Sequence, residues 1–201
     1  MGPGAVSRTR SVDPLARFRL WFRQARRARI PLPEAMALAT AAPKGIPSVR
    51  FVLVKVADER GFTFFTDTRS PKGRDLARNP HAALVFYWDP IGKQVRVSGR
   101  VEPVTDAEAD AYWCMRPRES RLAASASLQS APLASHAALL ARWRRLRSRY
   151  RGRDIPRPPG WRGFRVVADE IEFWTRRAHR LHHRELFVRT SRGWRRRLLQ
   201  P

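Results

Sequence analysis

The strongest constraint on the fold is a series of short runs that are rich in Val, Phe, Thr and Tyr. Five of them follow one another between residues 36 and 104: MALATAA, VRFVLVKVA, FTFFTD, AALVFYW and QVRVSGRVEPV. The segments PKGIP, DERG and DPIG between them have the composition of turns. Near the C-terminus, GFRVVA, EIEFWT, ELFVRT and WRRRLL are similar runs. Strands at this hairpin spacing predict an antiparallel sheet or barrel.

Helices are predicted at segments that carry capping residues and apolar residues at helical spacing. Asp13 and Pro14 supply an N-cap and a first turn, which predicts a helix to about Arg29. Ser70 and Pro71 predict a second, short helix in the same way. That helix is expected to end at Arg78. Three more helices are expected over 105–115, 118–127 and 133–151. A capping box of Thr105 and Glu108 opens the first of these three.

These elements together predict an α+β protein that is mainly β with helices. The GRDIPRPPG segment is expected to be a loop, because Pro and Gly interrupt it repeatedly. We find no internal repeat and no boundary that divides the chain. Residues 13–201 are therefore expected to form a single domain, preceded by a flexible arm over residues 1–12.

Cysteine content and the lengths of the apolar runs indicate the cellular compartment of the protein. The lone Cys114 cannot form an intramolecular disulfide, and no apolar run approaches the roughly 20 residues that cross a bilayer. The first residues also lack the apolar core of a secretory signal. These observations predict a cytoplasmic protein without a membrane partner.

A formal net charge of +24 has two interpretations. It favours binding to nucleic acid or another anionic surface. Nearly all the basic residues are Arg, however, which is what a GC-rich genome places on solvated faces, and the arginines between 142 and 153 fit the exposed side of a helix. The second interpretation is preferred, because the sequence carries no recognition helix or aromatic RNA-binding motif.

Familiar catalytic motifs are absent from the sequence. It contains no GxSxG, no Walker loop and no GxGxxG. The histidines His179, His182 and His183 lie among arginines, without the Cys or paired carboxylates that accompany a metal, so no metal site is predicted.

Polar residues on the predicted strands suit an anionic aromatic cofactor. Thr66, Ser70 and Lys72 surround the start of the short helix, where backbone amides, hydroxyls and an ammonium group could converge on a phosphate. Ordinary helix capping and surface charge explain the same residues equally well. Arg50 and Lys55 share one predicted strand at an odd separation, which places them on opposite faces unless a bulge intervenes and predicts that they serve different ligands.

Several motifs, in this order and spacing, resemble the pyridoxine/pyridoxamine 5′-phosphate oxidase family. They are RFVLVK, FFTDTRSPKGR, KQVRVSG, RPRES, LQS, IEFW and HRLHHR, and they span most of the chain from Asp13 onward. The resemblance implies a homodimeric split β-barrel that binds FMN at the subunit interface. By position, it implies flavin contacts from Arg50, Phe51, Val52, Leu53, Val54, Lys55, Phe65, Thr66, Lys72, Gln94, Gln129, Ser130, Trp174 and Arg184.

The resemblance also implies a substrate and a reaction. The substrate would be a phosphorylated B6 vitamer, with its phosphate near Lys55, Tyr112, Arg116 and Ser120 and its ring positioned by Arg180 and His182. Hydride would pass from the substrate to the flavin, and dioxygen would then be reduced to hydrogen peroxide. Since the cofactor performs the chemistry, Arg180 and His182 are assigned orienting and electrostatic roles in catalysis.

The sequence also departs from the family pattern. Pro71 stands where an Arg is usual, which predicts weaker FMN binding, and His183 replaces the usual Asp. Arg176, Arg177 and Ala178 replace a turn that is usually acidic and contains Gly, and the arm before Asp13 is shorter than is common. One alternative is therefore a flavin oxidase of the same fold that acts on another aromatic compound, as in phenazine biosynthesis. A non-enzymatic binder of nucleic acid or anionic surfaces is a second.

Overall fold

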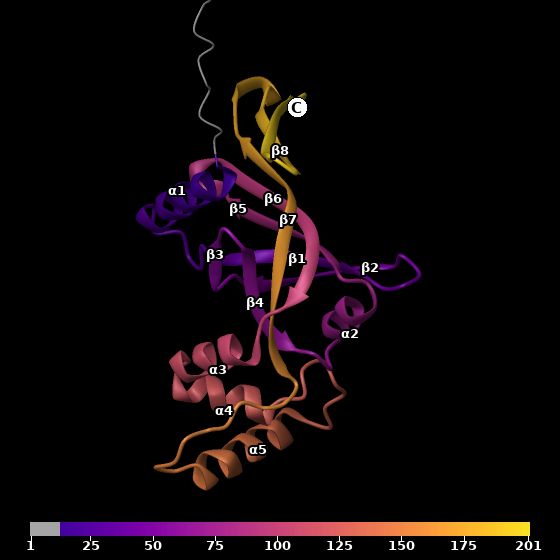
Figure 1. The fold of residues 1–201 in the computed structure, drawn as a ribbon. Coiled ribbons are helices and arrows are strands. Elements are labelled where there is room, and N and C mark those ends of the chain that lie inside the picture. The colour runs from indigo at the N-terminus through magenta and orange to yellow at the C-terminus, as the bar shows by residue number, and fades with distance from the viewer. Residues whose placement is uncertain (1–12) are drawn as a thin grey trace, which may run out of the picture.

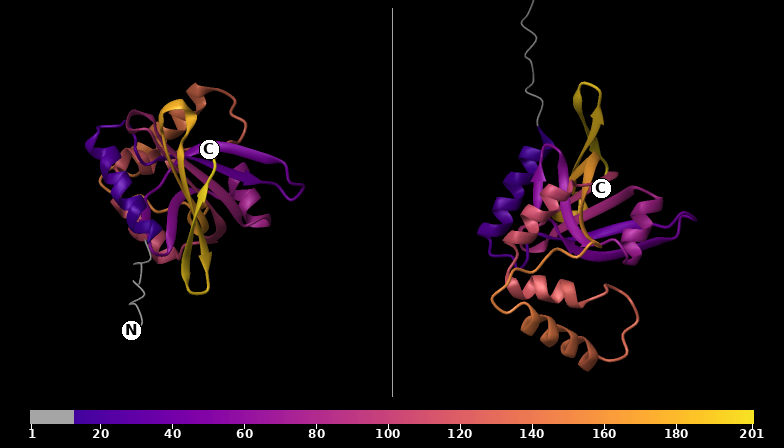
Figure 2. Two further views of the ribbon diagram at one scale, coloured as in Figure 1. Left: turned by 90° about the horizontal axis from the view of Figure 1, so that it is seen from above. Right: turned by 60° about the horizontal axis from the view of Figure 1, so that its bottom comes forward.

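The computed structural model describes residues 13–201, and the predicted arm over residues 1–12 lies outside the described residues (Figures 1 and 2). Nine strands form one sheet in which every pairing is antiparallel. The strands are β1 (Ala35–Ala41), β2 (Pro47–Leu53), β3 (Val56–Asp58), β4 (Gly61–Asp67), β5 (His81–Trp88), β6 (Lys93–Pro103), β7 (Trp161–Thr175), β8 (His183–Thr190) and β9 (Gly193–Leu199).

The helices lie around this sheet, so the α+β prediction is confirmed. In the described part of the chain they are α1 (Pro14–Arg27), α2 (Pro71–Arg78), α3 (Asp106–Met115), α4 (Arg118–Ala126) and α5 (His136–Arg149), with two short 3-10 helices, η1 (Asp89–Ile91) and η2 (Ala178–Arg180). The side chains of Asp13, Ser70 and Thr105 cap α1, α2 and α3 as predicted. Helix α5 is shorter than the expected 133–151.

Strand β7, with 15 residues, pairs with three other strands. The sheet order is β2-β1-β5-β6-β7-β4-β3, and β7 pairs along one side with β6. On its other side, its first half pairs with β4 and its second half with β8. Figure 1 shows β7 running from the end that holds α3, α4 and α5 to the end formed by β8 and β9. The two ends of β7 therefore belong to different parts of the surface.

The main core lies between α1 and the sheet. Phe18 of α1 is fully buried, with its ring centroid 4.8 Å from that of Phe62 and 4.9 Å from that of Phe86. A second cluster under α3, α4 and α5 contains Trp113 and Trp161. The indole of Trp113 donates a hydrogen bond to a backbone carbonyl at 2.7 Å, which satisfies its one buried polar group. This second cluster fixes the helices next to the first half of β7.

Two strand predictions were wrong in their boundaries. VRFVLVKVA is two strands, because the chain changes partners at Val54 and Lys55: the Val54 amide donates to Glu34 and the Lys55 amide to Thr63. GFRVVA and EIEFWT are parts of the single strand β7, with a shift in its pairing to β6 at Ser98 and Gly99. Such a bulge allows a long strand to bend and continue, so the sheet curls without a break in β7.

Candidate active site

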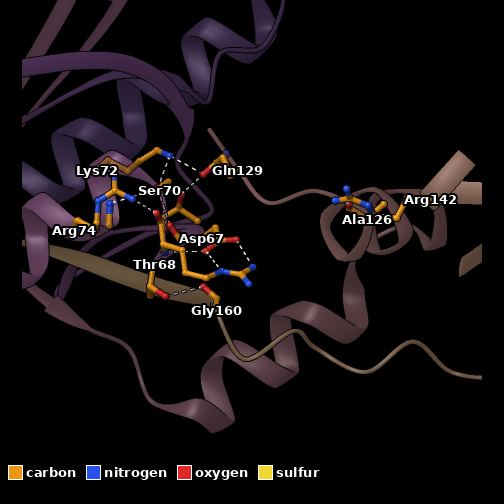
Figure 3. Close-up of polar contacts among 12 residues, drawn as sticks. Asp67, Thr68, Ser70, Lys72, Arg74, Ala126, Gln129, Arg142 and Gly160 are labelled. Atoms are coloured by element: carbon orange, nitrogen blue, oxygen red, sulfur yellow. Dashed lines mark hydrogen bonds and ion pairs between the residues drawn. The ribbon is translucent and has the colours of Figure 1, made fainter. Parts of the chain in front are cut away.

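The N-terminus of α2 is built closely against the loop that precedes it (Figure 3). Ser70 caps the helix by accepting from the Gly73 amide, and its hydroxyl donates to the Asp67 carbonyl at 2.6 Å. A Cβ on Gly73 would lie 2.4 Å from the Thr68 carbonyl oxygen, so a larger residue there would displace backbone. The sequence thus fixes the position of the first turn of α2, whose backbone amides form a suitable site for an anion.

The ammonium group of Lys72 lies in this first turn. It is 3.2 Å from the Ser70 hydroxyl and 2.7 Å from the side-chain oxygen of Gln129, as Figure 3 shows. The Thr66 hydroxyl donates to the same Gln129 oxygen at 2.9 Å. Burial, together with the nearby positive charge of Arg50, lowers the pKa of Lys72 to about 8. Lys72 is therefore a desolvated cation whose charge would be stabilised by an anion.

Arg50 is held beside Lys72 by residues of β1. Its guanidinium donates to the Thr40 hydroxyl at 2.8 Å and to the Leu38 carbonyl at 3.2 Å. Thr40 in turn donates to the Asp75 carboxylate at 2.8 Å. Burial lowers the pKa of Arg50, partly offset by Asp75. Thr40 and Asp75 thus orient Arg50, and sequence reasoning missed both because they come from other elements than β2.

Arg50 and Lys55 line the same cavity, so the predicted placement on opposite faces of one strand was wrong. The alternation of faces along a strand ends where β2 ends, and Lys55 lies in the connection to β3. Burial, opposed by Glu34, lowers the pKa of Lys55. The cavity, of about 420 Å³, is lined by Arg50, Phe51, Val52, Leu53, Lys55, Phe65, Thr66, Lys72, Tyr112, Arg116, Gln129 and Ser130. Four of these side chains are cationic and none is a carboxylate.

Arg116 joins this cavity to a second one, of about 320 Å³, that also contains Ser120. Its guanidinium donates to the Ser120 carbonyl at 3.1 Å and lies 5.0 Å from the centre of the Trp161 ring. Its Nε is buried without a hydrogen-bond partner among the described residues. Burial lowers the pKa of Arg116. A buried donor that lacks a partner is costly, so Arg116 is suited to receive an anionic ligand.

Aromatic rings form one wall of these cavities. The Phe65 ring is nearly parallel to those of Tyr112 and Trp161, at centroid distances of 4.2 and 4.9 Å, and the latter two rings are themselves 6.1 Å apart. Gly163, opposite Phe65 in the β4–β7 pairing, leaves room for this ring, because a Cβ there would lie 2.6 Å from it. Trp161 was not among the predicted site residues, and no motif in the sequence indicates it.

The remaining predicted residues form a second group at the other end of β7. Gln94, Trp174 and Arg184 are paired across β6, β7 and β8. The His182 ring lies 4.5 Å from that of Trp174, and its Nδ1 accepts from the Arg177 amide at 3.2 Å. Arg180 is nearby in η2, with a left-handed φ of 62°.

Glu172 fixes the position of Arg184 in the second group. Its buried carboxylate accepts from the Nε of Arg184 at 2.7 Å and from Arg96 at 3.0 Å. Glu172 belongs to the IEFW motif, but no role was predicted for it. Glu172 lies between the apolar residues Ile171 and Phe173. A carboxylate inside such an apolar run needs a cationic partner, so the sequence did contain a signal for this residue.

The two groups do not meet within one chain. Trp161 borders the first group and Trp174 belongs to the second, and the strand between them covers roughly 40 Å at the usual rise per residue. The predicted contact residue Val54 is buried in the core and lines neither cavity. In the part of the chain that the structure describes, no group of His, Cys, Asp or Glu is arranged to hold a metal.

Comparison with known proteins identifies the family. A family model described as Pyridoxamine 5′-phosphate oxidase matches residues 22–150. The chain belongs to the pyridoxamine 5′-phosphate oxidase family. A second model, the Pyridoxine 5′-phosphate oxidase C-terminal dimerisation region, matches residues 161–201, which include β7, β8 and β9.

Two curated members illustrate the similarity. The pyridoxine/pyridoxamine 5′-phosphate oxidase of Anaeromyxobacter dehalogenans is 54% identical over 94% of this chain and 96% of that protein. The protein of the same name from Sphingopyxis alaskensis is 49% identical over 99% of this chain and 92% of that one. The prediction that the chain is an oxidoreductase of this family is confirmed, and FMN is the cofactor that the family uses.

Solved structures confirm the predicted split-barrel fold. PhzG from Burkholderia lata, crystallised with tetrahydrophenazine-1-carboxylic acid, superimposes with a TM-score of 0.90 at 35% identity, covering 94% of this chain and 93% of that one. An FMN-binding protein from Nostoc punctiforme has the same fold, with a TM-score of 0.76 at 19% identity and coverage of 95% and 99%. No helix in residues 13–201 is long and apolar enough to cross a membrane.

Proposed function

We propose that the protein oxidises pyridoxine 5′-phosphate or pyridoxamine 5′-phosphate to pyridoxal 5′-phosphate, with FMN as cofactor, dioxygen as electron acceptor and hydrogen peroxide as product. The observation that carries this proposal is the cavity with four cationic side chains and no carboxylate, bordered by stacked aromatic rings. Such a site suits two phosphorylated aromatic molecules. The curated relatives that share about half of the sequence carry the name of this activity.

The flavin phosphate fits the start of α2. Lys72 and Arg50 would neutralise it, and the Thr66 hydroxyl would donate to it once Gln129 turns its amide toward the flavin ring. When bound, FMN supplies the acceptor for the hydride. The absence of a cation at Pro71 leaves Lys72 and Arg50 as the principal charges at this position.

The substrate phosphate fits the neighbouring position around Arg116. Arg116 lines both cavities, with Lys55 and Tyr112 in one of them and Ser120 in the other. A guanidinium can form two parallel hydrogen bonds with a phosphate, so Arg116 would orient the substrate as well as bind it.

The second group of residues would be supplied by another copy of the chain in a homodimer. Arg180 and His182 would position the substrate ring, and Gln94, Trp174 and Arg184 would complete the flavin site. The Arg177 amide donates to Nδ1 of His182, so the neutral ring carries its proton on Nε2, where it can donate to the substrate. Residues 161–201, which match the dimerisation region of the family, contain most of this group.

One specific observation supports a second candidate function. The structure with a TM-score of 0.90 is that of PhzG in complex with tetrahydrophenazine-1-carboxylic acid. The second candidate is therefore the oxidation of another aromatic compound by the same flavin arrangement. A phosphate presents more charge and more acceptor oxygens to Arg116, Lys55 and Ser120 than the single carboxylate of such a compound, which favours the B6 phosphates.

Two substitutions test the proposal in the FMN-loaded protein. Arg116→Ala should raise KM for the B6 phosphate about ten- to hundredfold, because it removes charge-assisted hydrogen bonds, and should leave FMN bound. Arg180→Ala should lower kcat as well, because it acts beside the reacting ring. Steady-state assays of peroxide release measure both values. Equal kinetics in Arg116→Ala and the parent protein would contradict the proposed substrate site.

A further inference from the structure

A basic cleft between α4 and α5 lies apart from the site described above. It has a volume of about 540 Å³, in the range of small-molecule sites. Its lining residues are Arg118, Glu119, Arg144, Arg147, Ser148, Arg151 and Gly152. None of them lines either cavity of the candidate active site. The cleft is therefore a separate feature of the surface.

Three arginines form one row along this cleft. Arg144 and Arg147 are three residues apart, which places them on the same side of α5, and Arg151, in the turn that follows the helix, lines the same cleft. The row spans roughly 10 Å along the helix axis. Arg118 faces the row from α4 and is held there by hydrogen bonds to the carbonyls of Tyr150 and, at 2.9 Å, Arg153.

The positive charge of the cleft is not neutralised within the described residues. None of its four arginines forms an ion pair there, and Glu119 is the one carboxylate in the lining. Nearby arginines differ: Arg157 pairs with Asp106 and Asp110, and Arg121 pairs with Asp154. Like charges at this spacing destabilise a helix slightly, so an anionic ligand would relieve a repulsion that the chain itself leaves in place.

We propose that this cleft binds a short chain of condensed phosphates, such as tripolyphosphate or the triphosphate of a nucleotide. One guanidinium group can donate two parallel hydrogen bonds to the oxygens of a phosphate. A single phosphate is too small to contact the whole row and Arg118 at the same time. A nucleic acid is less suited, because these four arginines line a single cleft between two helices, whereas a long backbone needs an extended basic track.

Binding of tripolyphosphate to the FMN-loaded protein tests this proposal by calorimetry at about 0.15 M salt. The variant R144Q/R147Q should bind at least about tenfold more weakly than the parent. R145Q/R149Q is the matched control, because it removes the same charge from the same helix at exposed positions outside the cleft. It should change the affinity less than about twofold. Flavin absorbance and thermal unfolding check that each variant is folded.

Further ligands distinguish the sources of the phosphate chain. Equal affinity for tripolyphosphate and ATP would indicate recognition of the phosphates alone, and tighter binding of ATP would indicate a nucleotide; either supports the cleft. Inorganic phosphate should bind at least about tenfold more weakly than tripolyphosphate. The proposal is overturned if the parent protein does not bind tripolyphosphate, if both double variants lose affinity equally, if only Arg116→Ala abolishes binding, or if a single-stranded oligonucleotide alone binds.

Discussion

At the residue level, the proposed flavin site depends on cations that the fold takes out of water. Lys72 is the clearest case, because burial and Arg50 lower its pKa to about 8. A phosphate beside it would favour the protonated form and raise that pKa. Binding of FMN therefore takes up a proton at pH values above about 8, and the affinity falls as the pH rises through that value.

A titration of FMN fluorescence between pH 7 and pH 9.5 would measure this dependence. The affinity of the parent protein should decline by up to about tenfold per pH unit above pH 8. Lys72→Met should bind FMN about ten- to hundredfold more weakly at pH 7, and its affinity should be nearly independent of pH in this range. A slope that is the same in both proteins would show that another group is responsible.

Single residues were predicted from the sequence where local pattern determines their position. Thr66, Ser70 and Lys72 were expected together because a helix begins at Pro71, and the structure brings them together. Arg50 and Lys55 were misplaced because the run containing them changes strand partners, which depends on Glu34 and Thr63 far away in the sequence. Trp161 owes its role to neighbours on other elements, which no local pattern reports. The apolar run around Glu172 indicates that this carboxylate needs a cationic partner, but the arginines that supply it lie on other strands.

At the level of elements, helix starts were predictable and strand ends were not. The capping residues of α1, α2 and α3 act within their own first turn, so the sequence contains the whole interaction. Strand boundaries depend on which neighbour supplies hydrogen bonds. The nine strands therefore match nine predicted runs in number while one run is divided and two are joined.

The cap of α2 gives a prediction that separates stability from binding. Ser70→Ala removes the N-cap and a contact of Lys72, so it should lower the free energy of unfolding by about 1 kcal/mol and also weaken FMN binding. Ser135→Ala removes the equivalent cap of α5, away from the proposed flavin phosphate site. It should cost a similar amount of stability without changing FMN affinity. Urea unfolding and FMN titration of both variants provide the comparison.

At the level of the whole molecule, the predicted site residues lie in two groups at opposite ends of β7. The sequence predicts these residues but does not divide them into groups, because a motif carries no information about which chain completes a site. The proposed homodimer joins Arg116 of one chain to Arg180 of the other. This arrangement predicts a specific behaviour of mixed dimers.

Arg116→Ala and Arg180→Ala chains carrying different tags can be co-expressed and the mixed dimer purified. If each site combines both chains, one of its two sites has neither substitution and the other has both. The mixed dimer should then show about half the activity of the parent dimer, although each variant alone is impaired. Activity no higher than that of the separate variants would mean that each site is formed within one chain.

Oxygen consumption with peroxide release by the FMN-loaded protein tests the proposed oxidation of a B6 phosphate. We predict turnover of pyridoxine 5′-phosphate or pyridoxamine 5′-phosphate, with formation of pyridoxal 5′-phosphate. Unphosphorylated pyridoxine and tetrahydrophenazine-1-carboxylic acid should react far more slowly, because neither places a phosphate at Arg116. Flavin-loaded protein that oxidises tetrahydrophenazine-1-carboxylic acid and neither B6 phosphate would contradict the account.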